Sequence, residues 1–135
     1  MKNELTLPDC ANITTGKLDS NASQNNGKYP FFTCAPSPLK INDYSFDCHA
    51  ILLAGNNAAG NFHINRYDGK FNAYQRTYVI TNKEGFNLDY LFYSIKMALI
   101  GFKRIAQGSQ TKFLTMDILN SFPIVKRDIT DQENL

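Results

Sequence analysis

The chain has 135 residues, of which 43% are hydrophobic and 19% charged, with 14 Lys and Arg against 12 Asp and Glu. This length corresponds to one domain of ordinary size, which can bury a core without disulfides or a metal. The apolar and aromatic content excludes an intrinsically disordered chain. The nearly balanced charge argues against a histone-like protein that binds only by bulk attraction to phosphate.

The N-terminal sequence argues against secretion. Residues 1–10 (MKNELTLPDC) contain no apolar run of the length that a signal peptide needs. The longest apolar-rich stretch, 88–102, is interrupted by polar residues and is too short to span a bilayer. Cys10, Cys34 and Cys48 are an odd number at irregular spacing, which predicts reduced thiols, mostly buried. We therefore expect a soluble, cytoplasmic protein with no membrane partner.

The first part of the chain has the pattern of short strands separated by turns. Short runs rich in aromatic or branched residues predict strands at 28–34, 50–54, 61–66 and 76–81. Asn- and Gly-rich pairs and triplets between them predict turns at 25–27, 55–57, 59–60 and 68–69. These features predict a β-rich portion over residues 1–86.

From Asn87 the apolar residues recur at three- and four-residue spacing, which predicts a helix at 88–107. Asn87 is a suitable N-cap, and Gly108 is a suitable stop. Thr115 is predicted to cap a shorter helix, 116–121, before an extended exit at 122–125. The whole pattern predicts an α+β fold with a helical portion over 87–125 and a polar tail over 126–135.

Catalytic and cofactor motifs are missing from the sequence. It contains no Walker loop, dinucleotide fingerprint, His-Glu-x-x-His, Cys-x-x-Cys or Gly-x-Ser-x-Gly. A metal site could draw on Cys34, Cys48, His49 and His63, but these residues lack the close ligand pairs of zinc sites. A hydrolase built on Cys48 and His63 would need a third orienting group that the sequence does not specify. We therefore predict neither metal, cofactor nor catalysis.

Polar loops with positive charges are the remaining candidates for function. They lie at 14–17, 55–60, 70–76 and 107–112. Asn and Gln side chains match the major-groove edge of adenine, Arg matches guanine, and Lys suits phosphate. Several such loops on one face would read bases without a recognition helix. The alternative is that Asn, Gly and Ser are simply the residues of which turns are made, and that Phe71 and Tyr74 are core aromatics.

Taken as a set, these segments resemble a known family. The segments that carry the likeness occur in order at 13–17, 29–34, 50–60, 71–80, 88–102 and 108–114. Together they resemble a target recognition domain of the DNA specificity subunit of type I restriction–modification systems. The resemblance implies a β-rich, partly coiled sheet beside a helical hairpin. It also implies a protein that reads DNA without catalysis, while methyltransferase and restriction subunits methylate or cut.

Two departures from that family matter. Its members usually carry two recognition domains joined by long helices, whereas this sequence contains one, over 1–125. Their proline-rich exit corresponds here to 123–127, and Gln132-Glu133 follows near the end. We expect a fragment or a truncated subunit whose tail, 126–135, would begin a linker helix.

A compact domain of this length is about 35–40 Å across, close to one DNA turn of roughly 34 Å. It therefore suits one half of a bipartite target, with a second recognition domain or a self-dimer for the other.

The leading hypothesis is thus a module that binds double-stranded DNA. Its predicted phosphate contacts are Lys17, Lys70 and Lys112, and its predicted base readers, with Tyr74 beside them, are Asn56, Asn57, Asn72, Gln75, Arg76 and Gln110. The alternation along 70–76 predicts that Lys70, Asn72 and Arg76 project from the core. The second hypothesis is a protein-interaction module that docks through the exposed face of helix 88–107 or through 122–125 and does not bind DNA stably.

Overall fold

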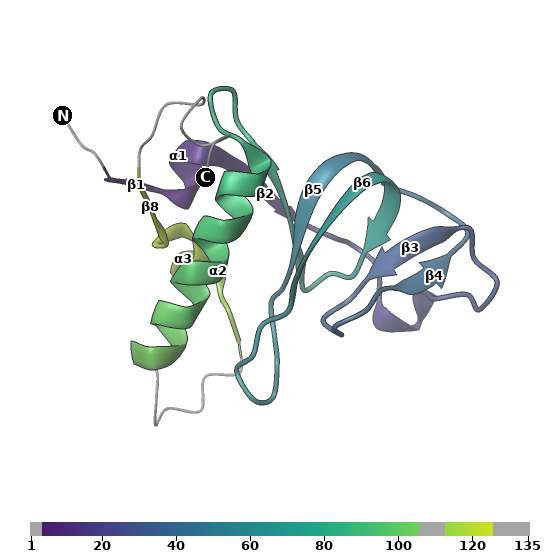
Figure 1. Ribbon diagram of the computed structural model, residues 1–135. Coiled ribbons are helices and arrows are strands. Elements are labelled where there is room, and N and C mark those ends of the chain that lie inside the picture. The colour runs from purple at the N-terminus through teal and green to yellow at the C-terminus, as the bar shows by residue number, and fades with distance from the viewer. Residues whose placement is uncertain (1–3, 106–112, 126–135) are drawn as a thin grey trace.

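A computed structural model describes residues 4–105 and 113–125 of the chain. The elements, in chain order, are β1 (Glu4–Thr6), α1 (Leu7–Cys10), β2 (Ala11–Thr15), η1 (Ser20–Ala22), β3 (Tyr29–Phe32), β4 (Leu39–Ile41), β5 (Phe46–Ala54), β6 (Ile64–Ala73), β7 (Thr77–Asn82), α2 (Leu88–Ile105), α3 (Met116–Asn120) and β8 (Pro123–Val125). Figure 1 shows a curved sheet with the three α-helices, β1 and β8 on one side and with β3 and β4 at the far end.

The main sheet has six strands in the order β2-β7-β5-β6-β3-β4. All of its pairings are antiparallel except that of β3 with β6, which places Phe31 beside Asn72 and Phe32 beside Ala73. The short strands β1 and β8 form a separate antiparallel pair. The chain is therefore α+β, as the sequence predicts, with β8 returning to pair near the N-terminus.

The longest strands extend beyond their predicted limits. β5 begins at Phe46 rather than residue 50, and β6 continues to Ala73. The turn predicted at 68–69 is wrong, because Asp68 and Gly69 lie inside β6, opposite His49 and Cys48. Gly69 has φ 141°, a conformation that L side chains rarely adopt, so the glycine serves a locally distorted strand rather than a reversal of the chain.

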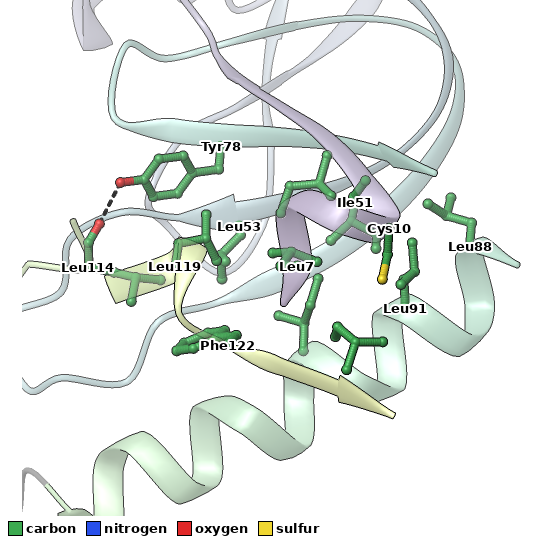
Figure 2. Close-up of a cluster of buried hydrophobic side chains, with 14 residues drawn as sticks. Leu7, Cys10, Ile51, Leu53, Tyr78, Leu88, Leu91, Leu114, Leu119 and Phe122 are labelled. Atoms are coloured by element: carbon green, nitrogen blue, oxygen red, sulfur yellow. Dashed lines mark hydrogen bonds between the residues drawn. The ribbon is translucent and has the colours of Figure 1, made fainter. Parts of the chain in front are cut away.

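The second half of β5, residues 50–54, is buried on both faces. On one side, Ile51 and Leu53 pack against Leu91 and Ile95 of α2, all of them fully buried or nearly so (Figure 2). On the other side, the alternate residues of β5 belong to a second apolar cluster with β3, β6 and β7, whose buried members are Phe32, Ala50, Leu52, Phe71, Ala73 and Val79. Burial on both faces explains why the run 50–54 is continuously apolar instead of alternating.

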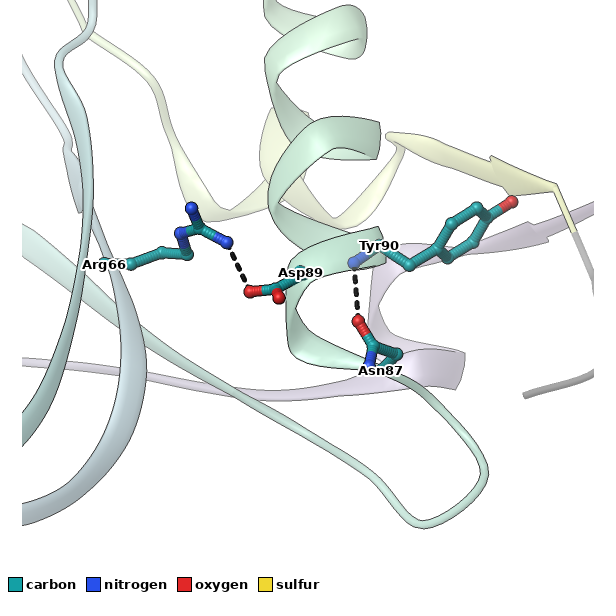
Figure 3. A network of polar contacts seen from close by, with 4 residues as sticks. All are labelled: Arg66, Asn87, Asp89 and Tyr90. Atoms are coloured by element: carbon teal, nitrogen blue, oxygen red, sulfur yellow. Dashed lines mark hydrogen bonds and ion pairs between the residues drawn. The ribbon is translucent and has the colours of Figure 1, made fainter. Parts of the chain in front are cut away.

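Helix α2 begins where the sequence predicts. The side chain of Asn87 accepts a hydrogen bond from the backbone N–H of Tyr90 at 3.0 Å, which caps the first turn. Asp89 in that turn forms an ion pair with Arg66 of β6 (Figure 3). The Arg66 guanidinium also lies 4.4 Å from the ring centroid of Phe92. These contacts fasten the N-terminal half of α2 to the sheet.

The second predicted helix is a short one. In α3 the side chain of Thr115 caps the helix by accepting from the backbone N–H of Ile118 at 3.3 Å. Within the segment 122–125, which is predicted to be extended, residues Pro123–Val125 form β8. Across the described ranges 4–105 and 113–125, no helix has the length and apolar character that crossing a membrane requires.

Replacement of Tyr78 by Phe should lower the free energy of unfolding by about 1–3 kcal/mol. The buried hydroxyl of Tyr78 donates to the carbonyl oxygen of Leu114 at 2.6 Å (Figure 2), and its loss leaves that acceptor without this donor. Urea unfolding of both proteins measures the difference. A matched control is Tyr93→Phe, since Tyr93 is exposed and should change stability by less than about 0.5 kcal/mol. Equal effects would contradict a structural role for the buried bond.

Candidate nucleic-acid interface

The tight turn between β6 and β7, Tyr74–Arg76, is the meeting point of three distant segments. The backbone N–H of Tyr74 donates to Phe32 at 2.9 Å, and that of Gln75 donates to Leu18 at 2.9 Å. The carbonyl oxygen of Arg76 accepts from the N–H of Gly55 at 2.8 Å. The turn is therefore held by the end of β3 and by the loops that follow β2 and β5.

Two glycines make this convergence possible because the backbones approach too closely for a side chain. A Cβ atom at Gly16 would lie 2.1 Å from the carbonyl oxygen of Ala73. A Cβ atom at Gly55 would lie 2.4 Å from the carbonyl oxygen of Arg76. Neither glycine has a positive φ, so the requirement is for space and not for a left-handed backbone.

We call this end of the sheet the β6–β7 edge. It comprises Lys17, Asn56, Tyr74, Gln75, Arg76 and Phe113. Lys17, Gln75 and Arg76 are exposed, and Asn56 and Tyr74 are half-buried. These residues provide two cations and two amide side chains, which are donors suited to phosphate and to base edges.

Phe113 is a member of the edge but is absent from the predicted DNA-contacting residues. It forms an isolated antiparallel bridge with Asn56, and its ring centroid lies 5.9 Å from the Arg76 guanidinium carbon. The ring remains 53% exposed. The signal in the sequence is its position in segment 108–114, one of the segments that carry the family resemblance.

Asn72 does not project from the core, so that expectation is wrong. The residue is 3% exposed, and its side-chain oxygen accepts from the backbone N–H of Ala73 at 3.1 Å. The parallel pairing with Phe31 encloses this end of β6. Asn72 therefore has no exposed amide to present to a base in this conformation.

The other predicted residues have different surroundings. The side-chain oxygen of Asn57 accepts from the N–H groups of Ala59 and Asn61 at 2.9 and 3.0 Å, so it closes its own loop. The ammonium of Lys70 lies 4.9 Å from the ring centroid of Tyr44, on the exposed part of β6. Gln110 and Lys112 lie outside the described residues.

Two of the cysteines, Cys10 and Cys48, are in surroundings that disfavour the nucleophilic thiolate form. Burial, followed by the negative charges of Asp47 and Asp68, raises the pKa of the Cys48 thiol. Burial, with Asp9 adding to it, raises the pKa of Cys10 to about 11. A raised pKa keeps a thiol protonated at neutral pH, whereas a nucleophile needs the thiolate. Within residues 4–105 and 113–125, no cluster of three or more His, Cys, Asp and Glu residues is placed to hold a metal ion.

Comparisons with known proteins agree with one another. A stretch of 74 residues, 55% of the chain, is 60% identical to the Type I restriction enzyme EcoDI specificity subunit of Escherichia coli and spans 16% of that protein. The type I restriction–modification S subunit from M. genitalium shares the fold, with a TM-score of 0.73 and 15% identity over 90% of this chain and 33% of that one. The HsdS subunit from Thermoanaerobacter tengcongensis has a TM-score of 0.69 and 11% identity over 97% of this chain and 34% of that one.

The chain thus spans about a sixth of the curated relative and a third of these solved subunits. Specificity subunits are non-catalytic components of restriction–modification systems. The family described as Type I restriction modification DNA specificity domain matches residues 2–125. Because this match includes nearly the whole sequence, the chain belongs to the family of type I restriction–modification DNA specificity domains.

Proposed function

We propose that this domain binds double-stranded DNA in a sequence-specific manner and reads one half of a bipartite target. The observation that carries the proposal is the convergence of Lys17, Gln75 and Arg76, all exposed, on the β6–β7 edge. Residues far apart in the sequence are fixed there by backbone hydrogen bonds. A backbone fixed in this way suits the reading of base edges, because the loops that carry these side chains need not be ordered on binding.

The residue types on the edge suggest distinct contacts. The Arg76 guanidinium can donate two hydrogen bonds to guanine, and the Gln75 amide can pair with adenine. Lys17 can contact a phosphate and so contribute to affinity without reading sequence. Tyr74 and Asn56 lie beside these three residues on the β6–β7 edge. Lys70 is a candidate for a phosphate contact farther along β6.

The proposed partners follow from the family. Type I specificity subunits bind DNA and assemble with methyltransferase and restriction subunits. We propose that this domain directs such subunits to its target in the cytoplasm, and that a second recognition domain or a second copy reads the other half-site. Linking two such domains would raise affinity through effective concentration.

A second candidate function rests on the exposed side of α2. Tyr93, Met97 and Ile100 lie at helical spacing along this side and are 56%, 66% and 53% exposed. This apolar stripe favours a protein-interaction module, with a methyltransferase subunit as the partner. A pull-down of that subunit with Met97→Glu, in parallel with the DNA measurements below, separates the two functions.

Arg76→Ala should change which sequence is preferred, with a loss of about 1–3 kcal/mol at the base pair that Arg76 contacts. Lys17→Ala should instead weaken binding to all sequences alike and reduce the slope of log affinity against log salt by about one. Selection from a randomised duplex pool, followed by titrations of the selected duplex over a salt series, measures both effects.

The matched control is Lys83→Ala. Lys83 follows β7 at the opposite end from Arg76, where its ammonium donates to the carbonyl oxygen of Pro8 at 2.8 Å. This variant should bind almost like the unaltered chain. If all three substitutions produce the same uniform loss, the β6–β7 edge does not read the sequence.

A further inference from the structure

Arg76 and Phe113 are held beside each other by the backbone rather than by chance contact of their side chains. Gly55 links them, because its N–H donates to the carbonyl oxygen of Arg76 at 2.8 Å and its carbonyl oxygen accepts from Leu114 at 2.8 Å. The bond from the Tyr78 hydroxyl to the Leu114 carbonyl oxygen, 2.6 Å, ties the same two segments a second time. Both backbones are thus fixed immediately next to the two side chains.

The ring of Phe113 has a location that core packing does not require. It is 53% exposed, whereas Leu114 beside it is 1% exposed and belongs to the main core. A large aromatic side chain left half in water buries less apolar surface than the same side chain would in the core. Its ring centroid lies 5.9 Å from the Arg76 guanidinium carbon, within the range of a cation–π interaction.

An exposed Arg side chain ordinarily samples many rotamers, and ordering them on binding costs conformational entropy. An aromatic ring beside the guanidinium restricts those rotamers, and a cation–π interaction with the ring does not use the N–H donors, which stay available to a base. Such restriction before binding raises both affinity and selectivity.

We propose that Phe113 is a positioning residue for base recognition, which acts by holding the Arg76 guanidinium in the orientation needed to pair with guanine. The inference rests on the proposed function. It assigns to the segment after residue 112 a role in setting specificity, although Phe113 itself need not touch a base.

The first test does not involve DNA. In the NMR spectrum of the 135-residue chain, ring currents of Phe113 should shift the side-chain Nε–H signal of Arg76. Phe113→Leu should move this signal toward the value of a free arginine, and Phe113→Tyr should preserve it. An unchanged Arg76 signal in Phe113→Leu would overturn the proposal whatever the domain binds.

The second test is a double-substitution cycle with the duplex selected from the randomised pool. Phe113→Leu should reduce discrimination at the Arg76-dependent base pair about two- to fivefold, and Phe113→Tyr should restore it. In the Arg76→Ala background, Phe113→Leu should have no further effect. Urea unfolding should show that the single Phe113 variants keep the stability of the unaltered chain, since the ring is mainly exposed.

The outcomes separate the two proposals. If Arg76→Ala leaves the base preference unchanged, the role of Arg76 in the proposed function fails, and the role of Phe113 fails with it. If Arg76→Ala alters the preference but Phe113→Leu does not, only the positioning role is overturned. An equal loss from Phe113→Leu with and without Arg76 also overturns it, because Phe113 would then act independently of Arg76.

Discussion

Replacement of Gly16 by Ala is expected to lower the free energy of unfolding by about 2–3 kcal/mol. The new methyl group would lie 2.1 Å from the carbonyl oxygen of Ala73 and 2.5 Å from that of Tyr74, so the loop after β2 must move away from the turn. The hydrogen bond from the Gly16 N–H to Thr77, 3.1 Å, then lengthens or breaks. Lys17 moves with the loop, so DNA affinity should fall together with stability.

The chain offers a matched control in Gly101. This glycine lies within α2, and a Cβ atom there would meet nothing within 4 Å. Gly101→Ala should therefore raise the free energy of unfolding by about 0.5–1 kcal/mol, because alanine is the better helix former. Urea denaturation of the two variants and the unaltered chain provides the comparison. Equal stability of both variants would show that the close approach at Gly16 is not maintained in solution.

Leu91→Ala should cost about 2–5 kcal/mol, the largest effect that we expect from a single substitution. Leu91 is 0% exposed and belongs to the cluster that joins α2 to β5 (Figure 2). Truncation removes apolar contacts and leaves a cavity that rigid strands cannot fill. Because a domain of this kind is stable by only about 5–15 kcal/mol, much of the folded state is at risk.

Met97→Ala is the control on the same helix. Met97 is 66% exposed, so its truncation should change stability by less than about 0.5 kcal/mol. Thermal unfolding followed by circular dichroism measures both variants. A large effect of Met97→Ala on the isolated chain would mean that the exposed side of α2 is covered in solution, by a second copy or by another part of the chain.

The fold was predictable to different extents in different segments. Helix α2 was predicted because its apolar residues repeat at helical spacing and Asn87 and Asp89 mark its first turn. The strands β2 and β4 escaped prediction because most of their residues are exposed or half-buried, so no apolar run marks them in the sequence. The turn prediction at Asp68-Gly69 was wrong because the same dipeptide occurs both in turns and in distorted strands. Only the pairing of these residues with β5 distinguishes the two structures.

The candidate site was also predictable only in part. The sequence by itself determined the kinds of side chain present: loops with Lys, Arg and amides, and no motif for catalysis or a cofactor. Lys70 and Asn72 are two residues apart and so lie on the same face of β6. The alternation of the strand could not reveal that Asn72 is buried while Lys70 is exposed, since β3 pairs only with the end of β6.

Composition and local periodicity therefore determined the α+β fold class, the main helix and the polar loops, because these depend on neighbouring residues. The tertiary structure decided which loop residues meet. Lys17, Gly55, Arg76 and Phe113 are brought together by backbone hydrogen bonds between segments far apart in the sequence. Such non-local pairing depends on how the whole sheet closes, and no local pattern of residues encodes it.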